Sequence, residues 1–539
     1  MLSARTRLGS FRVVGTCFRR FINCNACGIV LQDKDPARAG FYIKPKRPIV
    51  NRLAKLEDVK YLLFSQELQK AKDSVPVGSL DELRKSKSHS LSCKRCNDAL
   101  HSNRYTKEGF ARFSFDQVLE FVPRNSNVVH VASLPEFPFH LVKKVLQDAN
   151  FKSSLVLTKG DQLVKDKATL QRKVDLFFRD FLKYHLRIPT NKVIATSAIR
   201  KWNIPTVYAN LSSSSYLLGN ANVGKSTLIN GLLQKFPGSK MDGEGLASTP
   251  TETGQLAGVL HIPNMTRNLQ AFKVADKVIN DLPGFTTDLN EVDLEDIIER
   301  EWLDKIRKTD QFKVRKLKKK TYISLRGTEN GGCLTLGGIF FLVPPPETIN
   351  QVVKYIPGAV HQFANVAKGL EVFKLCKESP DHALAKSCGI KPNVCSIDAY
   401  ARHIIPPFQG SIEIVFKDIG YVLLRSTGKY NFTKPYEIWV PKGIDVCVRE
   451  PLSSLIEEGY ENSVESRGKK PACPRSRPLV SSTYIVPQDE TNPLERMKLM
   501  YLQRTERDLS SRRHHNVNPW DVVKTLHDEP PNLYWHYKW

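Results

Sequence analysis

Short apolar runs recur through the middle of the chain, and each is followed by glycine or polar residues. The runs are Leu155-Val156-Leu157, Tyr216-Leu217-Leu218 and Val278-Ile279. Runs of this length, bounded by turn residues, are typical of buried strands. Apolar residues at helical spacing follow the second run, namely Leu228, Ile229, Leu232 and Leu233. A strand followed by an amphipathic helix predicts an α/β domain in this part of the chain.

The C-terminal third shows a different pattern, in which apolar and polar residues alternate. Alternation of this kind predicts strands with one buried face. The alternating segments are residues 411–416, 421–425, 437–440 and 446–449, with turns at Gly420, Gly428 and Pro441-Lys442-Gly443. We therefore expect a folded, mixed α/β domain in this region and not a linker.

The loop after the run at 216–218 fits the phosphate-loop pattern GxxxxGK[ST], and its strand and helix context favours this interpretation over a simple glycine turn. Its two glycines permit backbone angles that point N–H groups at a phosphate. Lys225 is expected to reach the β- and γ-phosphates, and the Ser226 hydroxyl to bind Mg²⁺. The predicted nucleotide-binding residues here are Gly219, Asn222, Gly224, Lys225, Ser226 and Thr227.

A candidate base-reading motif, Thr158-Lys159-Gly160-Asp161, follows the run at 155–157; the alternative is a polar turn. The Asp161 carboxylate can accept from the N1–H and exocyclic amine of guanine, a donor pair that adenine lacks, and the Lys159 stem can cover the base. The ideal motif begins with asparagine. We expect Thr158 to remove a donor towards the base and a loop-bracing hydrogen bond, at a cost of roughly 1 kcal/mol. Ser197 and Ala198 lie at a fitting distance to support the base.

The segment Asp281-Leu282-Pro283-Gly284 follows the apolar run at 278–279. Asp281 is expected to hold Mg²⁺ through water, as the corresponding aspartate of phosphate-loop proteins does. Gly284 is expected to offer its N–H to the γ-phosphate. Phe285 stands where signalling GTPases have a glutamine that orients water, and phenylalanine cannot do this. The sequence therefore predicts slow intrinsic hydrolysis.

The order of these motifs is base, base support, phosphate and switch, whereas an ordinary GTPase places the phosphate loop first. The order predicts a circularly permuted GTPase domain. Such a domain keeps the same sheet and pocket, but its C-terminal end leaves from beside the switch that senses the γ-phosphate. A domain fused there can be moved by the nucleotide.

With this motif order, phosphate loop and flanking modules, the chain resembles the YqeH branch of circularly permuted GTPases over nearly its whole length. The resemblance implies a role in ribosome assembly and, through Asn222, the use of K⁺ as a catalytic element. Residues 248–254 loosely resemble the family's Pro-Gly-Thr-Thr switch, so Thr251 or Thr253 is the expected Mg²⁺-sensing threonine. The predicted catalytic set is Asn222, Thr253, Asp281 and Gly284.

Two C-x-x-C pairs lie near the N-terminus, at Cys24 and Cys27 and at Cys93 and Cys96. Four thiolates in a tetrahedral array are what structural Zn²⁺ prefers. The pairs are further apart than in a usual zinc ribbon, and residues 56–70 between them read as an amphipathic helix. Members of the YqeH family carry a zinc module at the same place, which favours zinc over the alternatives of buried thiols or a redox pair.

Residues 1–22 are rich in arginine, serine and threonine, and the chain has no acidic residue before Asp33. This composition predicts a mitochondrial transit peptide, with a basic nucleic-acid-binding arm as the alternative. The chain contains no apolar run of the ~20 residues that a membrane-spanning helix needs, and eleven cysteines without a secretory signal favour thiols and metal over disulfides. We therefore expect a protein of the mitochondrial matrix.

The formal net charge of +26 over 539 residues favours a polyanionic partner such as RNA. The densest basic run, residues 305–320, follows the switch and is either a solvated face or an RNA-binding element that responds to the nucleotide. The expected organisation is a transit peptide (1–22), a zinc module (23–110), a permuted GTPase domain (111–305) and a C-terminal α/β domain (306–539), for which the family resemblance implies RNA or protein binding. An aromatic tail at 534–539 ends the chain, and we expect it to pack back onto this domain.

These features predict a mitochondrial, Mg²⁺-dependent GTP-binding protein that acts on the small ribosomal subunit and its rRNA. A narrower resemblance, to a yeast mitochondrial protein linked to prohibitins, implies an alternative: a GTP-binding scaffold that affects lipid metabolism at the inner membrane. A G domain that has lost turnover is a third interpretation, for which Thr158 and Phe285 are the warning signs.

Overall fold

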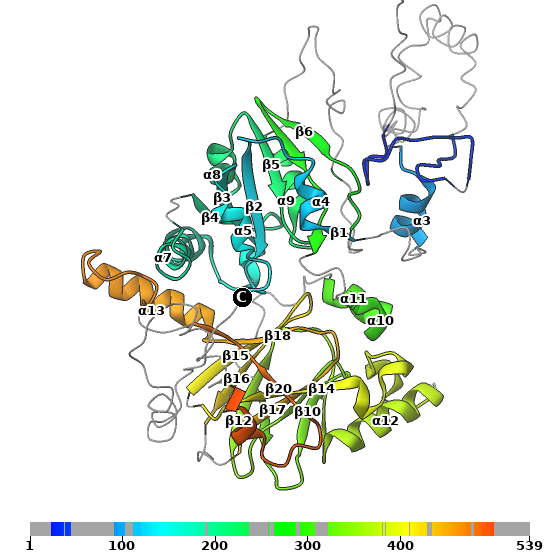
Figure 1. The fold of residues 1–539 in the computed structure, drawn as a ribbon, viewed down its shortest axis with the longest axis vertical. Helices are drawn as coiled ribbons and strands as arrows, with labels where there is room; N and C mark the ends of the chain where they lie inside the picture. Colours follow the sequence, from blue (N-terminus) through cyan, green and yellow to red (C-terminus); the bar gives the residue numbers. More distant parts are fainter. Residues whose placement is uncertain are drawn as a thin grey trace, which may run out of the picture. The chain divides into compact units, whose positions relative to one another are not determined.

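The computed structural model describes residues 23–36, 38–44, 91–102, 112–188, 192–236, 257, 264–286, 292–307, 322–379, 381–382, 384–408, 410–427, 434–475, 479–497 and 499–500. The chain forms two compact units, Met1–Gly109 and Phe110–Trp539 (Figure 1). Several predicted segments lie outside the described residues: the transit segment, the helix at 56–70, the switch segment at 248–254, most of the basic run at 305–320 and the aromatic tail.

In the first unit, two short chain segments and one helix are described. The backbone around the first cysteine pair turns back on itself, with bridges between Asn23 and Val30 and between Gln32 and Phe41. Helix α3, Lys94–Ser102, begins directly after Cys93. Both C-x-x-C pairs are therefore on ordered backbone.

The G domain, defined as the described residues between 112 and 286, contains a six-stranded sheet in the order β4-β3-β2-β5-β7-β6. Neighbouring strands are parallel except for β6, which runs antiparallel to β7. The strands are β2 (Asn127–Ser133), β3 (Lys152–Thr158), β4 (Val193–Ala195), β5 (Ser214–Leu218), β6 (Gln270–Val274) and β7 (Lys277–Asp281). The base motif thus follows β3 and the phosphate loop follows β5, which confirms the permuted order of a P-loop domain.

Helices cover both faces of this sheet because the strands are apolar on both sides. Helices α8 and α9 share a core with Val131 and Val156, whereas α7 packs with Leu155 and Leu157. The helices of this domain are α4 (Phe115–Leu119), α5 (Lys143–Gln147), α6 (Lys167–Thr169), α7 (Asp175–His185), α8 (Ile204–Asn210) and α9 (Lys225–Lys235). Strand β1 (Phe113–Ser114) pairs with β8 (Phe285–Thr286), directly after the Asp281–Gly284 segment.

The C-terminal domain, defined as the described residues between 292 and 500, is built on two six-stranded antiparallel sheets. Their orders are β13-β10-β11-β17-β14-β20 and β19-β18-β15-β16-β12-β9. The strands are β9 (Ile323–Arg326), β10 (Cys333–Leu336), β11 (Phe341–Val343), β12 (Ile349–Lys354), β13 (Val360–Phe363), β14 (Tyr400–Ile405), β15 (Gly410–Phe416), β16 (Gly420–Ser426), β17 (Tyr436–Pro441), β18 (Val446–Arg449), β19 (Val480–Ser482) and β20 (Tyr484–Val486). All four segments predicted from alternation are strands.

The described helices beside these sheets include α10 (Leu294–Ile297), α11 (Arg300–Arg307), α12 (Val366–Glu378) and α13 (Leu452–Glu465), and residues 493–497 and 499–500 are also helical. Trp302 and Leu303 of α11 pack into the core of the C-terminal domain, although the predicted boundary at 305/306 assigns them to the GTPase domain. Within the part of the chain that the structure describes, no helix has the length and apolar character needed to cross a membrane.

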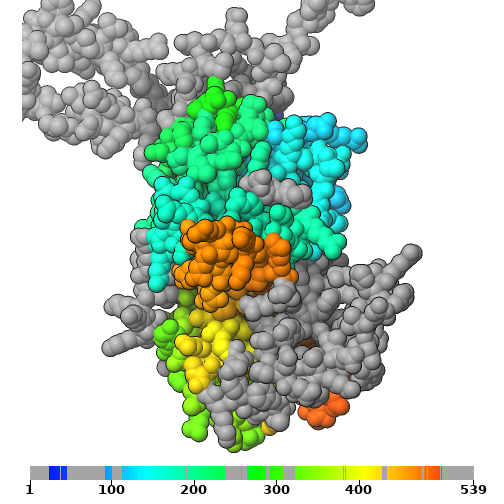
Figure 2. Space-filling view, turned by 90° about the vertical axis from the view of Figure 1, so that its left-hand side faces the viewer, coloured from blue at the N-terminus to red at the C-terminus, as the bar shows by residue number. Residues whose placement is uncertain are grey.

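The two domains of this unit pack closely against each other. One core cluster contains Phe177 and Phe178 of α7 together with Val415, Cys447 and Leu455 of the C-terminal domain. Helix α13 lies across this boundary, with the G domain on one side and the C-terminal strands on the other (Figure 2). Because side chains of both domains share this core, a movement of the C-terminal domain would change the packing of the G domain.

Candidate nucleotide-binding site

The phosphate loop leaves β5 at Leu218 and returns into α9 at Lys225. Gly224 has a φ of +97° and Asn222 a φ of +58°, the left-handed conformation that glycine and asparagine adopt most readily. A Cβ on Gly219 would lie 2.3 Å from the backbone oxygen of Val131, so the neighbouring strand excludes any larger residue. These two glycines are thus required by the backbone, as the motif predicts.

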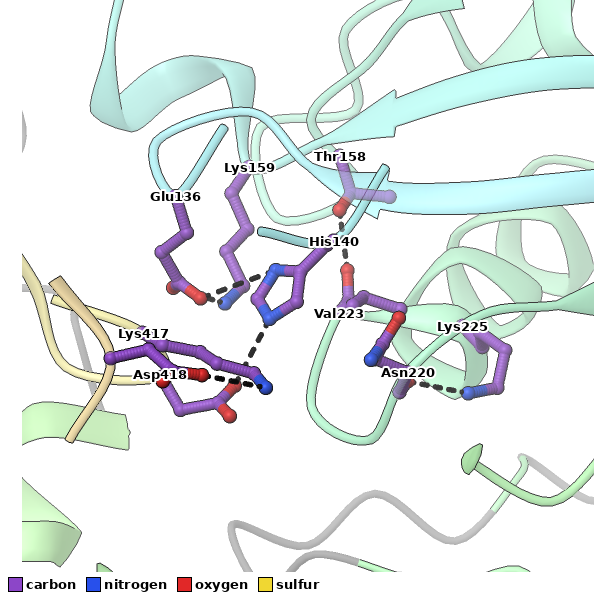
Figure 3. A network of polar contacts seen from close by, with 10 residues as sticks. Glu136, His140, Thr158, Lys159, Asn220, Val223, Lys225, Lys417 and Asp418 are labelled. Carbon is purple, nitrogen blue, oxygen red and sulfur yellow. Dashed lines mark hydrogen bonds and ion pairs between the residues drawn. The ribbon is translucent and has the colours of Figure 1, made fainter. Parts of the chain in front are cut away.

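The Lys225 ammonium lies inside the loop. Its Nζ donates to the backbone oxygens of Gly219 and Asn220, both at 2.8 Å, and the residue is 7% exposed (Figure 3). Burial lowers the pKa of Lys225 to about 8, and the charge of Asp281 opposes this effect. The cation is therefore held by the loop at the place where the motif expects phosphate oxygens.

Ser226 and Asp281 meet at the base of the loop. The Ser226 hydroxyl donates to Asp281 Oδ2 at 2.9 Å, and Asp281 is 1% exposed. Burial raises the pKa of Asp281 to about 6, against the lowering effects of the Lys225 charge and of hydrogen bonds from Ser226 and Thr266. Asp281 Oδ1 is buried and has no hydrogen-bond partner among the described residues. A hydroxyl beside a carboxylate with an unpaired oxygen fits a Mg²⁺ site.

Thr266 is a site residue that the sequence analysis did not single out. It is 7% exposed, lines the same pocket, lowers the pKa of Asp281 and lies four residues before β6. A threonine just ahead of this strand is the available signal, because the next strand leads directly to Asp281. Thr251 and Thr253, the predicted switch threonines, lie outside the described residues.

Thr158 corrects one expectation from the sequence. Its hydroxyl contacts two backbone oxygens, that of Val223 in the phosphate loop and that of Ala132, the latter at 3.1 Å (Figure 3). The expected loss of the loop-bracing hydrogen bond is therefore wrong, since the shorter side chain is buried close enough to make it. The hydroxyl is occupied by these contacts, so it does not replace the amide donor towards a base.

Asp161 and Ser197 lie together at the base end of the site. The Ser197 hydroxyl donates to Asp161 Oδ1 at 2.5 Å, and Asp161 is 6% exposed. The backbone N–H of Gly160 donates to the oxygen of Thr196 at 3.0 Å, which joins the two base motifs. The Lys159 ammonium pairs with Glu136 Oε1 at 3.2 Å. The base-reading and base-supporting segments thus form one unit.

Gly284 and Phe285 have different surroundings. A Cβ on Gly284 would lie 2.8 Å from the Cα of Ala221, so glycine is required where the switch segment approaches the phosphate loop. The Phe285 side chain is 2% exposed and packs edge-on against Phe115 with ring centroids 5.1 Å apart. Phenylalanine here belongs to a hydrophobic core and leaves the water-orienting role unfilled.

A single cavity of about 280 Å³ connects these motifs. The predicted residues that line it are Thr158, Lys159, Asp161, Ser197, Ala198, Asn222, Gly224, Lys225, Ser226, Thr227 and Gly284. Asp281 and Gly219 do not line the cavity themselves, but they accept hydrogen bonds from Ser226 and Lys225, which do. The structure therefore brings the base, phosphate and switch motifs to one pocket.

The four N-terminal cysteines form a second candidate site. The Sγ atoms of Cys24, Cys27, Cys93 and Cys96 all lie within 4.8 Å of one another, and all four side chains are buried. Hydrogen bonds from the other three thiols lower the pKa of Cys24. None of the four is in a disulfide. A buried tetrad of thiols fits structural Zn²⁺ and leaves no coordination position for catalysis.

Comparison with known proteins gives the family. Models described as "Genetic interactor of prohibitins 3 N-terminal domain" and "Genetic interactor of prohibitins 3, C-terminal domain" match residues 23–110 and 320–525, and one described as "50S ribosome-binding GTPase" matches residues 214–320. A Zygosaccharomyces rouxii protein named "Genetic interactor of prohibitins 3, mitochondrial" is 54% identical over 98% of this chain and 96% of its own length. The chain belongs to the genetic interactor of prohibitins 3 family.

Other members of this family are similarly close. The Saccharomyces cerevisiae S288c protein of the same name is 46% identical, over 96% of each chain. Among solved structures, the crystal structure of YjeQ from Thermotoga maritima is 23% identical, with a TM-score of 0.19 over 30% of this chain and 49% of that chain. Membership of a family whose proteins are named mitochondrial, together with the GTPase domain, identifies a mitochondrial GTP-binding protein. The GTPase domain implies Mg²⁺ as well as GTP or GDP.

Proposed function

We propose that this protein is a GTP-dependent switch of the mitochondrial matrix that binds rRNA during assembly of the small ribosomal subunit. The observation that carries the proposal is the convergence of Lys225, Ser226 and Asp281 beside a pocket that also contains Asp161. These groups provide a charge for the phosphates, a cation site and a guanine acceptor in one place.

The permuted topology supports a switching role. The chain leaves the G-domain sheet at Asp281 and Gly284 and continues into the C-terminal domain, so a change at the γ-phosphate is transmitted along the chain itself. The net charge of +26 supports a polyanionic partner. GTP would favour the RNA-binding arrangement, and hydrolysis would release it.

The choice of ribosomal subunit rests on the resemblance to YqeH-type GTPases, whereas the matching GTPase family is described by binding to the 50S subunit. We assign the small subunit, and sedimentation distinguishes the two. Tagged protein from mitochondria should migrate with small-subunit particles on a sucrose gradient in the presence of a non-hydrolysable GTP analogue. It should leave those particles in GDP or after ribonuclease treatment.

Lys225→Ala is the matching variant for that experiment, with Lys235→Ala on the exposed end of the same helix as its control. Loss of co-sedimentation in Lys225→Ala alone is the expected result. Co-sedimentation that ignores both the nucleotide and Lys225→Ala would contradict the switch. Migration with large-subunit particles would contradict the choice of subunit.

Zinc and potassium complete the proposal. The Cys24, Cys27, Cys93 and Cys96 tetrad would hold a structural Zn²⁺ that fixes the N-terminal module. Asn222 lines the pocket at the tip of the phosphate loop and is the residue that would bind K⁺. Faster GTP turnover in K⁺ than in Na⁺, abolished by Asn222→Ala, is the test of that role.

The relatives are named as genetic interactors of prohibitins, and we therefore keep one further candidate, a GTP-binding scaffold that affects lipid metabolism at the inner membrane. Mitochondrial fractionation separates the two functions. A scaffold would sediment with membranes and prohibitin complexes, and ribonuclease would not release it.

A further inference from the structure

The nucleotide pocket has a second wall that comes from the C-terminal domain. Besides the GTPase motifs, the 280 Å³ cavity is lined by Tyr355, Asp418, Ile419, Gly420 and Tyr421. Residues 417–420 form the tip of the hairpin between β15 and β16, in which Phe416 pairs with Gly420. The cavity is therefore shared between two domains, and the hairpin tip lies at its edge.

A histidine of the G domain holds this hairpin tip. His140 Nε2 lies 3.1 Å from Asp418 Oδ1, and His140 Nδ1 lies 3.3 Å from Glu136 Oε2 (Figure 3). The His140 side chain is 1% exposed and that of Glu136 is 10% exposed. A buried imidazole thus stands between two carboxylates, one from each domain.

The same network reaches the guanine motif. Glu136 uses its other oxygen, Oε1, to pair with the Lys159 ammonium at 3.2 Å. Lys159 belongs to the Thr158–Asp161 motif, so three consecutive polar contacts connect the base end of the pocket to Asp418. Any shift of Lys159 towards a bound base changes the charge balance at Glu136, and hence at His140.

A neighbouring contact anchors the loop that carries this network. Arg449 of β18 donates through Nη1 to the backbone oxygen of Phe137 at 2.5 Å, and its Nε donates to Glu413 Oε2 at 2.7 Å. Phe137 lies between Glu136 and His140, so the loop is fixed to the C-terminal domain at two adjacent places. The position of the loop that carries Glu136 and His140 is therefore fixed by contacts outside the network itself.

One ligand atom each of Glu136, His140 and Asp418 lies within 4.8 Å of the others, which is close enough for a shared metal ion. Two observations nevertheless disfavour a metal ion here, since the two ring nitrogens of His140 face different carboxylates and the Lys159 ammonium already pairs with Glu136. Burial of Asp418 opposes its ionisation, but the hydrogen bond from His140 and the charges of His140, Lys417 and Lys159 lower its pKa to about 2.

We propose that residues 417–420 form a lid of the nucleotide pocket, that Asp418 and His140 are its positioning residues, and that bound nucleotide leaves only when this lid separates from the G domain. A partner that displaces the C-terminal domain then acts as a nucleotide-exchange factor. The inference rests on the proposed binding of guanine nucleotide in this pocket, but not on the choice of ribosomal partner.

The test is the dissociation rate of fluorescent mant-GDP from the full-length protein, chased with excess unlabelled GDP. Asp418→Asn and His140→Gln should each release mant-GDP about tenfold faster, because each removes one charge-assisted hydrogen bond from the closed lid. Asp418→Glu keeps the charge and should stay close to the wild-type rate. The double variant Asp418→Asn/His140→Gln should be no faster than the faster single variant, because both act through one contact.

Glu329→Gln is the matched control, since it breaks an exposed ion pair to Lys434 within the same domain and away from the pocket. It should leave the rate unchanged. The thermal unfolding midpoint is measured for each variant, and Asp418→Asn carries the test if the buried His140 substitution prevents folding. A wild-type dissociation rate in folded Asp418→Asn overturns the lid. Absence of guanine-nucleotide binding in the wild-type protein overturns both the lid and the proposed function, whereas normal binding with unchanged release overturns the lid alone.

Discussion

The hydroxyl of Thr158 contacts the backbone oxygen of Val223, so the residue that departs from the guanine motif joins the base-reading segment to the phosphate loop. Threonine in place of asparagine therefore removes a donor towards the base edge but keeps a hydrogen bond to the phosphate loop. Thr158 is 4% exposed, so its hydroxyl needs a partner inside the protein. The two halves of the pocket are thus coupled by one buried side chain.

Removal of this hydroxyl should weaken nucleotide binding. Thr158→Val has nearly the same shape but lacks the hydroxyl hydrogen that bonds to the Val223 or the Ala132 oxygen, and this loss costs about 1 kcal/mol, or roughly a fivefold weaker Kd for GDP. Thr158→Ser keeps the hydroxyl and is the control. Equilibrium titration with mant-GDP measures both, and equal affinities for the two variants would show that the brace has no role.

Thr158→Asn tests the other half of the argument. Asparagine adds the amide donor that the base edge lacks and should increase the preference for GDP over ADP. A competition titration of bound mant-GDP with the two unlabelled nucleotides measures this preference. An unchanged ratio would mean that Asp161 alone determines base choice.

Loss of the Asp281 charge should raise the stability of the ligand-free protein and weaken its Mg²⁺-dependent nucleotide binding. Its pKa rises from 3.8 to about 6 on folding because the carboxyl is buried, so the folded protein binds the proton more tightly than the unfolded chain does. The resulting stabilisation is complete below about pH 3.8 and is lost as the pH rises to about 6. At pH 7.5 the buried charge therefore destabilises the ligand-free protein.

Asp281→Asn removes this charge and should raise the free energy of unfolding at pH 7.5 by about 2 kcal/mol, with a smaller gain at pH 5. Urea unfolding in EDTA measures the stability, with Glu371→Gln, which neutralises an exposed acid on α12, as the control. The same variant should lose Mg²⁺-dependent nucleotide binding. Lower stability of Asp281→Asn at pH 7.5 would contradict the view that the buried charge of Asp281 destabilises the protein when no cation is bound.

The cysteine tetrad should contain about one zinc ion per chain. Cys27→Ser removes a thiolate ligand and should abolish the zinc detected by elemental analysis, whereas Cys473→Ser, at a buried cysteine of the other unit, should leave it unchanged. Chelation should make the N-terminal unit sensitive to protease while the G domain stays intact, because the metal contributes directly to folding of such small modules. Equal zinc content in Cys27→Ser and the wild type would contradict a tetrahedral site.

The phosphate loop and base motifs were predictable because their chemistry is local. Gly219, Gly224 and Lys225 act through a loop of eight residues, and the backbone angles that the motif demands can be inferred from residue types alone. The strands between 411 and 449 were predictable from their alternation and turn residues, but the expectation of one buried face is wrong, because β15 and β16 are buried along most of their length on both faces.

The sequence analysis missed Thr266 and the contact between His140 and Asp418. Thr266 lies outside residues 248–254, where the sequence predicts the switch threonine, so only its position before β6 and its place in the pocket near Asp281 reveal it. His140 and Asp418 are 278 residues apart in sequence, and no spacing rule relates them. Packing of the C-terminal domain onto the G domain brings them together, which a reading of local patterns cannot anticipate.

Variants of Arg449 can separate its contribution to stability from its contribution to the contact between the C-terminal domain and the G domain. Its side chain is 1% exposed and pairs with Glu413, which is 5% exposed. Arg449→Ala leaves the Glu413 carboxylate buried without its cation and should lower the free energy of unfolding by about 3–5 kcal/mol. The double variant Arg449→Met/Glu413→Leu removes both charges, fills the space with apolar atoms and should recover most of that loss.

The double variant still lacks the hydrogen bond from Arg449 to the Phe137 oxygen, which fixes the loop carrying Glu136 and His140. Its stability should therefore approach that of the wild type while mant-GDP release remains several-fold faster, because the lid is held by one anchor and not two. Urea unfolding and stopped-flow release measure the two properties on the same protein. If release returned to the wild-type rate together with stability, the Phe137 contact would contribute to folding alone, and the hold on the lid would come entirely from His140 and Asp418.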